Sequence, residues 1–406
     1  MHNKRGRSWR AGSRSAARVF FTVLLAVCSS AFAQLPDFLQ VGWRLTWEAG
    51  DSQISGSRLV PDPSGPLERD GQRYRLEGTR GGGGIGLVQL DMVASGQDGL
   101  LADLRFFLNL DVQTGALRAS GNDVVIGGPG GLGEYWVPPA NLAALTPGFD
   151  GRTRISRSTV AFGGQTLNVV TIATPGQGSY SSQTYDLGSG LMLFSGTMHS
   201  SQGTSITDPN GQITNLAGSV AYSHKSFLGV RQLSVPWAFE PPPQWATPGR
   251  AHFYQGESRA EFNSPTGLPP LGGQGIQITQ VFDRQVGGAI LARQIVQAAT
   301  TAGLPPSEST SQRAFSSLLF DNIWFPPRAF GSLQPQQVLD QDPFSRQTTF
   351  YAGVSGNYGV IVVQGSSDYL ENYYDLNSGL LMFSRYRVQA ASVGTQVTET
   401  QWVGQQ

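Results

Sequence analysis

The sequence predicts a mainly β protein made of two tandem homologous antiparallel β domains with little helix. Three observations predict this class: short branched-apolar runs, turn signatures between them, and an internal repeat. Each domain is expected to be either a sandwich or a curved half-barrel sheet.

Strand-like runs recur along the chain. Residues 167–173 and 358–364 are each rich in valine and isoleucine and are bounded by turn residues. Helix is expected only in short pieces, such as 141–145 after a double proline. Residues 289–298 fit a helix and a strand equally well.

The chain carries the same pattern twice. Residues 185–195 and 374–384 are identical at eight of eleven positions. Three further pairs of segments match in the same order along the chain: 44–52 with 250–258, 84–90 with 275–281, and 136–139 with 324–327. The repeat predicts one β domain at 38–232 and a second at 246–406.

A proline- and tryptophan-rich linker, residues 233–245, is predicted between the two domains. Its three consecutive prolines favour a stiff, extended segment. The tryptophans on either side of them suggest that the linker is pinned to a domain surface.

The most similar segments of the two copies predict a hairpin turn. Both read Tyr-Asp-Leu-x-Ser-Gly-Leu. Asp186 and Asp375 are expected to accept backbone N–H groups within the turn, and Gly190 and Gly379 to adopt a positive φ. These four residues are predicted to be structural.

Residues 1–33 have the features of a cleavable secretory signal. Basic residues precede an apolar stretch at 19–27, and the segment ends on Ala31-Phe32-Ala33. The apolar stretch is about half the ~20 residues that span a bilayer, so no transmembrane anchor is expected after cleavage. The chain is predicted to be exported, to the periplasm or the extracellular medium.

Removing this segment changes the composition of the working chain. It holds six of the 28 basic residues and none of the 28 acidic ones, so the remainder has a net charge near −6. That sign argues against a nucleic-acid partner. The single cysteine, Cys28, leaves as well, which makes the mature chain cysteine-free, and Lys225 is then the only lysine.

Motifs for catalysis or cofactor binding are weak. The glycine-rich stretches 81–86 and 128–133 match a phosphate-loop pattern, but neither is followed by a predicted helix. No G-x-S-x-G elbow occurs, and no histidine has a second one at metal-ligand spacing. No cofactor and no metal site are predicted.

Carboxylates leave two alternatives open. Asp186 and Asp375 are related by the repeat and could form a glycosidase pair, but a turn role is the favoured interpretation. Asp340 and Asp342 could supply oxygen ligands to Ca²⁺, yet the spacing of a calcium loop is missing, and a turn before Pro343 is favoured.

Aromatic residues near the repeat landmarks are the candidate ligand contacts. Exposed, they could stack on sugars or apolar ligands; buried, they fill the two cores, and core packing is favoured. These residues are Trp43, Trp47, Trp136, Trp324 and Tyr254.

These patterns favour an exported, non-enzymatic binding or structural protein whose partner is a small molecule, lipid or glycan. Ligand would bind in the concavity of a sheet or in the groove between copies. The alternative is a secreted hydrolase that acts on glycan or another polymer through paired carboxylates. The hairpin-rich copies resemble the curved sheets of bacterial periplasmic lipoprotein carriers in general pattern; this resemblance implies a fold and no function.

Overall fold

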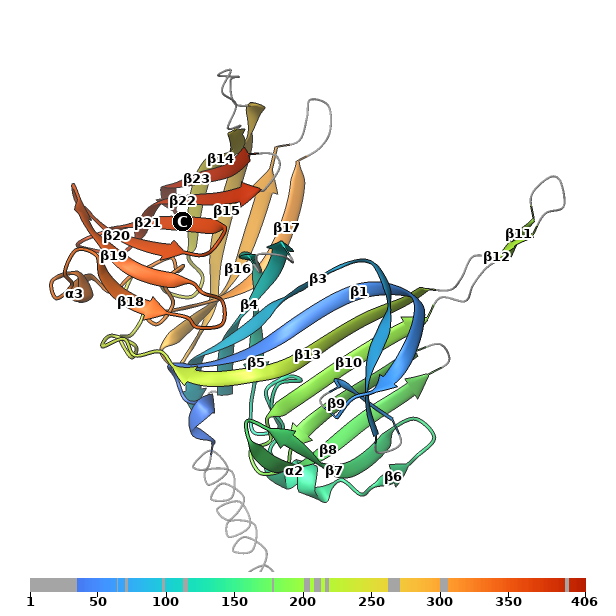
Figure 1. The fold of residues 1–406 in the computed structure, drawn as a ribbon. Coiled ribbons are helices and arrows are strands. Elements are labelled where there is room, and N and C mark those ends of the chain that lie inside the picture. Colours follow the sequence, from blue (N-terminus) through green and yellow to red (C-terminus); the bar gives the residue numbers. More distant parts are fainter. Residues whose placement is uncertain are drawn as a thin grey trace, which may run out of the picture.

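The computed structural model describes residues 35–63, 65–69, 72–96, 99–111, 116–176, 179–200, 205–207, 213–215, 219–261, 271–299, 306–390 and 394–406. The predicted signal at 1–33, with Cys28, lies outside these residues. The described chain consists mainly of two large antiparallel sheets, and little of it is helical (Figure 1). This confirms the predicted fold class. Within this part of the chain, no helix is both long and apolar enough to cross a bilayer.

The first sheet contains eleven strands. Ten of them form a continuous path, and the eleventh pairs only with β3. In path order they are β5 (Ala116–Gly127), β4 (Gly99–Asp111), β3 (Gln72–Gly96), β1 (Trp43–Pro61), β13 (Ser219–Gln232), β10 (Met192–Ser200), β9 (Ser179–Asp186), β8 (Gln165–Gly176), β7 (Arg154–Phe162) and β6 (Gly148–Phe149), with β2 (Leu67–Arg69) beside β3.

The second sheet contains ten strands. In path order they are β17 (Ser307–Ser316), β16 (Ala289–Ala298), β15 (Leu271–Val286), β14 (Ala251–Glu261), β23 (Gly394–Gln405), β22 (Leu381–Ala390), β21 (Asp368–Asp375), β20 (Tyr358–Gln364), β19 (Thr348–Ser355) and β18 (Gln337–Gln341). The 289–298 segment, which fitted a helix or a strand, is therefore strand β16.

The two sheets share one topology. If β2 and the separate hairpin of β11 (Ser205–Thr207) and β12 (Ile213–Asn215) are set aside, both paths visit their strands in the same order. Each therefore begins at a central strand, runs outward to one edge, crosses to the other edge and returns to the centre. Within the described residues, β2 and the β11–β12 hairpin have no counterpart in the second copy.

A cover segment, residues 131–145, packs on one face of the first sheet. It contains the short helix α2 (Pro139–Ala144), whose first residue is a proline, as helix N-termini favour. Its Tyr135 ring lies 4.9 Å from the ring of Trp47, and Trp136 is buried in the same hydrophobic core. A second cover segment, residues 318–333, contains α3 (Pro327–Phe330) and contributes buried side chains to the cores of the second sheet.

Each cover segment is attached to the repeated hairpin turn. The backbone of Trp136 bridges to Leu191, and that of Trp324 bridges to Leu380. Gly190 has a φ of +78°, and a Cβ there would lie 2.0 Å from a cover-segment carbonyl oxygen; the values for Gly379 are +70° and 2.2 Å. A side chain at either position would displace the cover segment, so both the backbone angle and the close approach require glycine.

The two sheets meet along a buried charged contact, which we call the seam. Its members are Arg44, Asp91, Asp103, Arg105 and Arg231 from the first sheet and Arg313, Asp321, Asp340 and Asp342 from the second copy. Arg44 donates through Nη2 to Asp91 at 2.7 Å and through Nη1 to Asp342 at 2.9 Å. An apolar cluster beside it also joins both copies, with Leu101 packed among residues such as Ala289 and Phe325.

The seam contains five aspartates and four arginines, so its carboxylates outnumber its guanidinium groups by one. Burial raises the pKa of Asp342, but Arg44, the N–H of Ser345 and Arg231 outweigh it, so that pKa lies well below its usual value. Asp103 shows the opposite result. It is fully buried, and burial raises its pKa to about 6 even though Arg105 opposes the shift.

Replacing Asp103 with asparagine is expected to remove one pH dependence of stability. The folded chain holds the Asp103 proton more tightly than the unfolded chain does, so the stabilisation is complete below about pH 4 and is lost as pH rises through about 6. A pKa of about 6 in place of 3.8 corresponds to at most about 3 kcal/mol of stability. Urea unfolding from pH 4.5 to 7.5 should show Asp103→Asn becoming more stable relative to the unmodified chain as pH rises. A difference between the two chains that does not vary with pH would contradict this assignment.

Candidate functional site

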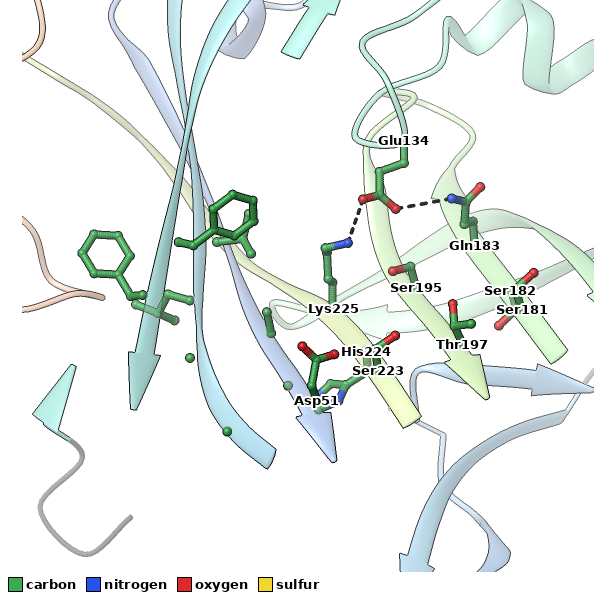
Figure 2. Close-up of a pocket in the computed structure, with 18 of the residues that line it drawn as sticks. Asp51, Glu134, Ser181, Ser182, Gln183, Ser195, Thr197, Ser223, His224 and Lys225 are labelled. Carbon is green, nitrogen blue, oxygen red and sulfur yellow. Dashed lines mark hydrogen bonds and ion pairs between the residues drawn. The ribbon is translucent and has the colours of Figure 1, made fainter. Parts of the chain in front are cut away.

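A cavity of about 400 Å³ lies on the face of the first sheet that also carries the cover segment. It is bordered by β8, β9, β10, β13, β1, β3 and β4, together with Glu134 of the cover segment (Figure 2). Its volume falls within the range of about 300–1,000 Å³ that is common for small-molecule sites.

Strand register explains which side chains share this face. Directly opposed residues in antiparallel strands point to the same side of a sheet. One row of such residues, the lysine row, crosses seven strands as Ile172, Gln183, Ser195, Lys225, Ala49, Gly86 and Leu108. The next, the aspartate row, consists of Thr174, Ser181, Thr197, Ser223, Asp51 and Gly84. Every member of both rows lines the cavity.

The cavity exists because these rows are built from small residues. Two positions before Ala49 on the same face, Trp47 is completely buried and is opposed by Val88 and Phe227. Those large side chains fill the space beneath the cover segment. Serine, alanine and glycine leave it open further along the same strands.

An ion pair spans the top of the cavity. Lys225 Nζ lies 2.7 Å from Glu134 Oε1, and Gln183 Nε2 lies 3.5 Å from Glu134 Oε2 (Figure 2). The Lys225 ammonium also lies 5.9 Å from the centre of the Tyr135 ring. Both charged side chains keep about a quarter to a third of their surface exposed, so they can be reached from the cavity.

Several hydroxyl groups of the floor have no partner. In the described chain, no hydrogen bond engages the side chains of Ser181, Ser195, Thr197 or Ser223, nor the carboxylate of Asp51. Ser195 is only 9 % exposed. Ser181, Thr197 and Ser223 are half-buried and Asp51 is exposed, so these groups can be reached by a ligand.

The second copy lacks this polar constellation. Its corresponding row reads Ile361, Asn372, Ser384, Thr400, Gly256, Ile276 and Ala298. Thr400 therefore occupies the position of Lys225, and Asn322 that of Glu134. A cavity of about 320 Å³ beside Gly256 is lined by eight residues, none of them charged.

The aromatic residues proposed as ligand contacts lie elsewhere. Trp47, Trp136, Trp324 and Tyr254 are buried, Trp43 is partly buried, and none of the five lines the cavity of the first sheet or the one beside Gly256. Three of them bond to backbone: Trp47 Nε1 donates to Met192 O, Trp136 Nε1 to Ser189 O, and Tyr254 Oη to Leu381 O.

The repeated aspartates are directed into their own turns. Asp186 accepts the N–H and the hydroxyl of Ser189 at 2.7 and 2.6 Å, and Asp375 accepts those of Ser378 at 2.7 and 2.8 Å. Burial raises the pKa of Asp375, but the Ser378 bonds outweigh it and lower the pKa. The two carboxylates belong to separate sheets and share no site.

The remaining sequence candidates are also placed. Asp340 and Asp342 belong to the seam, where they face Arg44 and Arg231. The glycine-rich stretch 81–86 lies within β3, and 128–133 forms a tight turn before the cover-segment bridge. Within the described residues, no three His, Cys, Asp or Glu side chains are grouped as a metal site.

His224 lies in the first sheet and His252 in the second, and in the described part of the chain neither forms part of a catalytic group. His224 stacks on Tyr222 with ring centres 5.2 Å apart, and by alternation along β13 it lies on the opposite face from Lys225. His252 is buried, and burial followed by the charge of Arg250 lowers its pKa to about 4. Neither imidazole is bonded to a carboxylate at hydrogen-bond distance among the described contacts; the nearest, His224 to Glu48, is 3.9 Å.

Comparison with known proteins gives no family. No family model matches the chain, and no curated protein matches it. Among solved structures, the crystal structure of MucB in complex with MucA(peri) matches over 94 % of this chain and 93 % of that chain, at 11 % identity and a TM-score of 0.20. A score this low establishes neither a family nor a function.

Replacing Lys225 with methionine is expected to leave stability nearly unchanged. Both members of the ion pair are partly exposed, and such pairs contribute roughly 0–1 kcal/mol. Methionine keeps most of the apolar side chain beside Tyr135. Urea unfolding should therefore show a change below about 1 kcal/mol, which would make Lys225→Met suitable for binding studies. A loss of several kcal/mol would instead give the pair a structural role.

Proposed function

We propose that this chain is an exported binding protein that holds a small ligand in the concave cavity of its first sheet. The observation that carries the proposal is the set of unpartnered hydroxyls in the lysine and aspartate rows, roofed by the Lys225–Glu134 pair. The signal-like composition of residues 1–33 supports export, and the periplasm or the extracellular medium is the proposed location.

The difference between the two copies supports a specialised site. Two sheets of the same topology need the same turns and cover segments, and both keep them. Stability gives no reason for one copy alone to carry a lysine, a glutamate and open space on its concave face. Ligand binding supplies such a reason, because small-molecule sites combine apolar surface with a few placed polar groups.

The matched serines Ser195 and Ser384 allow a direct test. Ser195→Leu should fill the cavity, whereas Ser384→Leu changes the equivalent position of the second sheet, away from it. Thermal unfolding would be measured with neutral oligosaccharides, phospholipid dispersions and calcium chloride. At least one probe should stabilise the unmodified chain and Ser384→Leu but not Ser195→Leu, by about 2.7 kcal/mol at a hundredfold excess over Kd.

Two results would contradict the proposal. One is the absence of stabilisation by every probe in the unmodified chain. The other is stabilisation that survives in Ser195→Leu, which would place the binding site outside this cavity. Circular dichroism of both variants without ligand serves as the folding control.

Hydrolysis of glycan is a second candidate, because Asp51 and Glu134 both line the cavity and neither carboxylate recurs in the second copy. A glycosidase pair needs one carboxyl group free to deliver a proton. Both oxygens of Glu134 are already engaged, by Lys225 and Gln183. Release of reducing sugar that disappears in Glu134→Gln would favour hydrolysis over simple binding.

A further inference from the structure

We infer that the cavity of the first sheet takes a neutral, hydroxyl-rich ligand, a short stretch of uncharged glycan. The inference rests on the proposed binding function and adds the chemical class of the ligand. Three properties of the lining lead to it: its charge, its hydrogen-bonding groups and its apolar side.

The charge of the lining disfavours an acidic ligand. The ionisable side chains on the cavity face are Asp51, Glu134 and Lys225, so carboxylates outnumber ammonium groups. The one ammonium group is already paired with Glu134 at 2.7 Å. A carboxylate, sulfate or phosphate entering the cavity would have to displace Glu134 from Lys225 while remaining near Asp51.

The hydroxyl groups disfavour an acyl chain. Ser181, Ser195, Thr197 and Ser223 lie on adjacent strands of the floor, and their side chains make no hydrogen bond within the described structure. Covering such a group with hydrocarbon is unfavourable, because its hydrogen bonds to water are lost and none replaces them. Hydroxyls both donate and accept, as does the amide of Gln183, so together they match a ligand that presents donors and acceptors along its length.

Apolar residues border the polar floor along β4. Leu108 belongs to the lysine row, and Phe106, two residues before it, lies on the same face opposite Val88. Sugar rings present C–H faces as well as hydroxyl edges, so a ring can rest against this border and direct its hydroxyls to the serines. A ligand of uniform polarity would match only half of the lining.

Calorimetric titration of the full chain would test the class directly. The probes are cellotetraose, maltotetraose and chitotetraose as neutral glycans, tetragalacturonate as the acidic glycan, and lysophosphatidylcholine below its micelle concentration as the acyl ligand. A neutral tetrasaccharide should bind at least tenfold more tightly than tetragalacturonate. In the Asp51→Asn/Glu134→Gln double variant, the ratio of the Kd for tetragalacturonate to the Kd for the neutral tetrasaccharide should fall about tenfold. Ser195→Leu should abolish binding, whereas Ser384→Leu should not.

The possible failures can be told apart. If tetragalacturonate binds as tightly as the neutral sugars, or if only lysophosphatidylcholine binds and Ser195→Leu blocks it, the ligand class is wrong while the cavity remains a binding site. If no probe binds, the inference is overturned, and the binding function itself loses support when thermal unfolding also shows no effect.

Discussion

The attachment of each cover segment to the repeated hairpin turn is the interaction on which the rest of the fold depends. Asp186 and Asp375 organise the turns, and Gly190 and Gly379 let a backbone strand pass within bonding distance. In the first copy this attachment buries Tyr135 and Trp136 over Trp47. The same contact fixes where Glu134 stands, so the structural motif that defines the repeat also positions the roof of the cavity.

The second constraint is side-chain size along a fixed register. Both sheets place large residues under the cover segment, and only further along the same strands do the copies diverge. There the first sheet has serine, alanine and glycine beside a single lysine, and the second has threonine and asparagine without charge. The seam, with Arg44 at its centre, then joins the two sheets through ion pairs and a shared apolar cluster. A duplicated fold thus carries one specialised concave face.

The fold class could be predicted from the sequence because turns and branched-apolar runs determine structure locally. The repeat could be recognised because the turn tolerates few substitutions. The lysine row could not be read in advance, since its members come from seven strands whose register depends on bulges such as that between Thr46 and Trp47. The aligned segments at the head of each copy are one residue out of register. Trp47 and Tyr254 occupy equivalent positions, because Trp47 donates to Met192 O and Tyr254 donates to the matching carbonyl, Leu381 O. For Asp340 and Asp342, the arginine partners lie more than 100 residues away.

Amine labelling of Lys225 tests the central claim most directly, because it is the only lysine beyond residue 33 and it faces the cavity. The rate of acetylation at Lys225, located by peptide mass mapping, would be measured with and without a saturating neutral tetrasaccharide. A ligand held beneath the Lys225–Glu134 pair should slow labelling severalfold in the unmodified chain and in Ser384→Leu, but not in Ser195→Leu. Saturating binding of that tetrasaccharide with an unchanged labelling rate would place the ligand elsewhere and contradict the account.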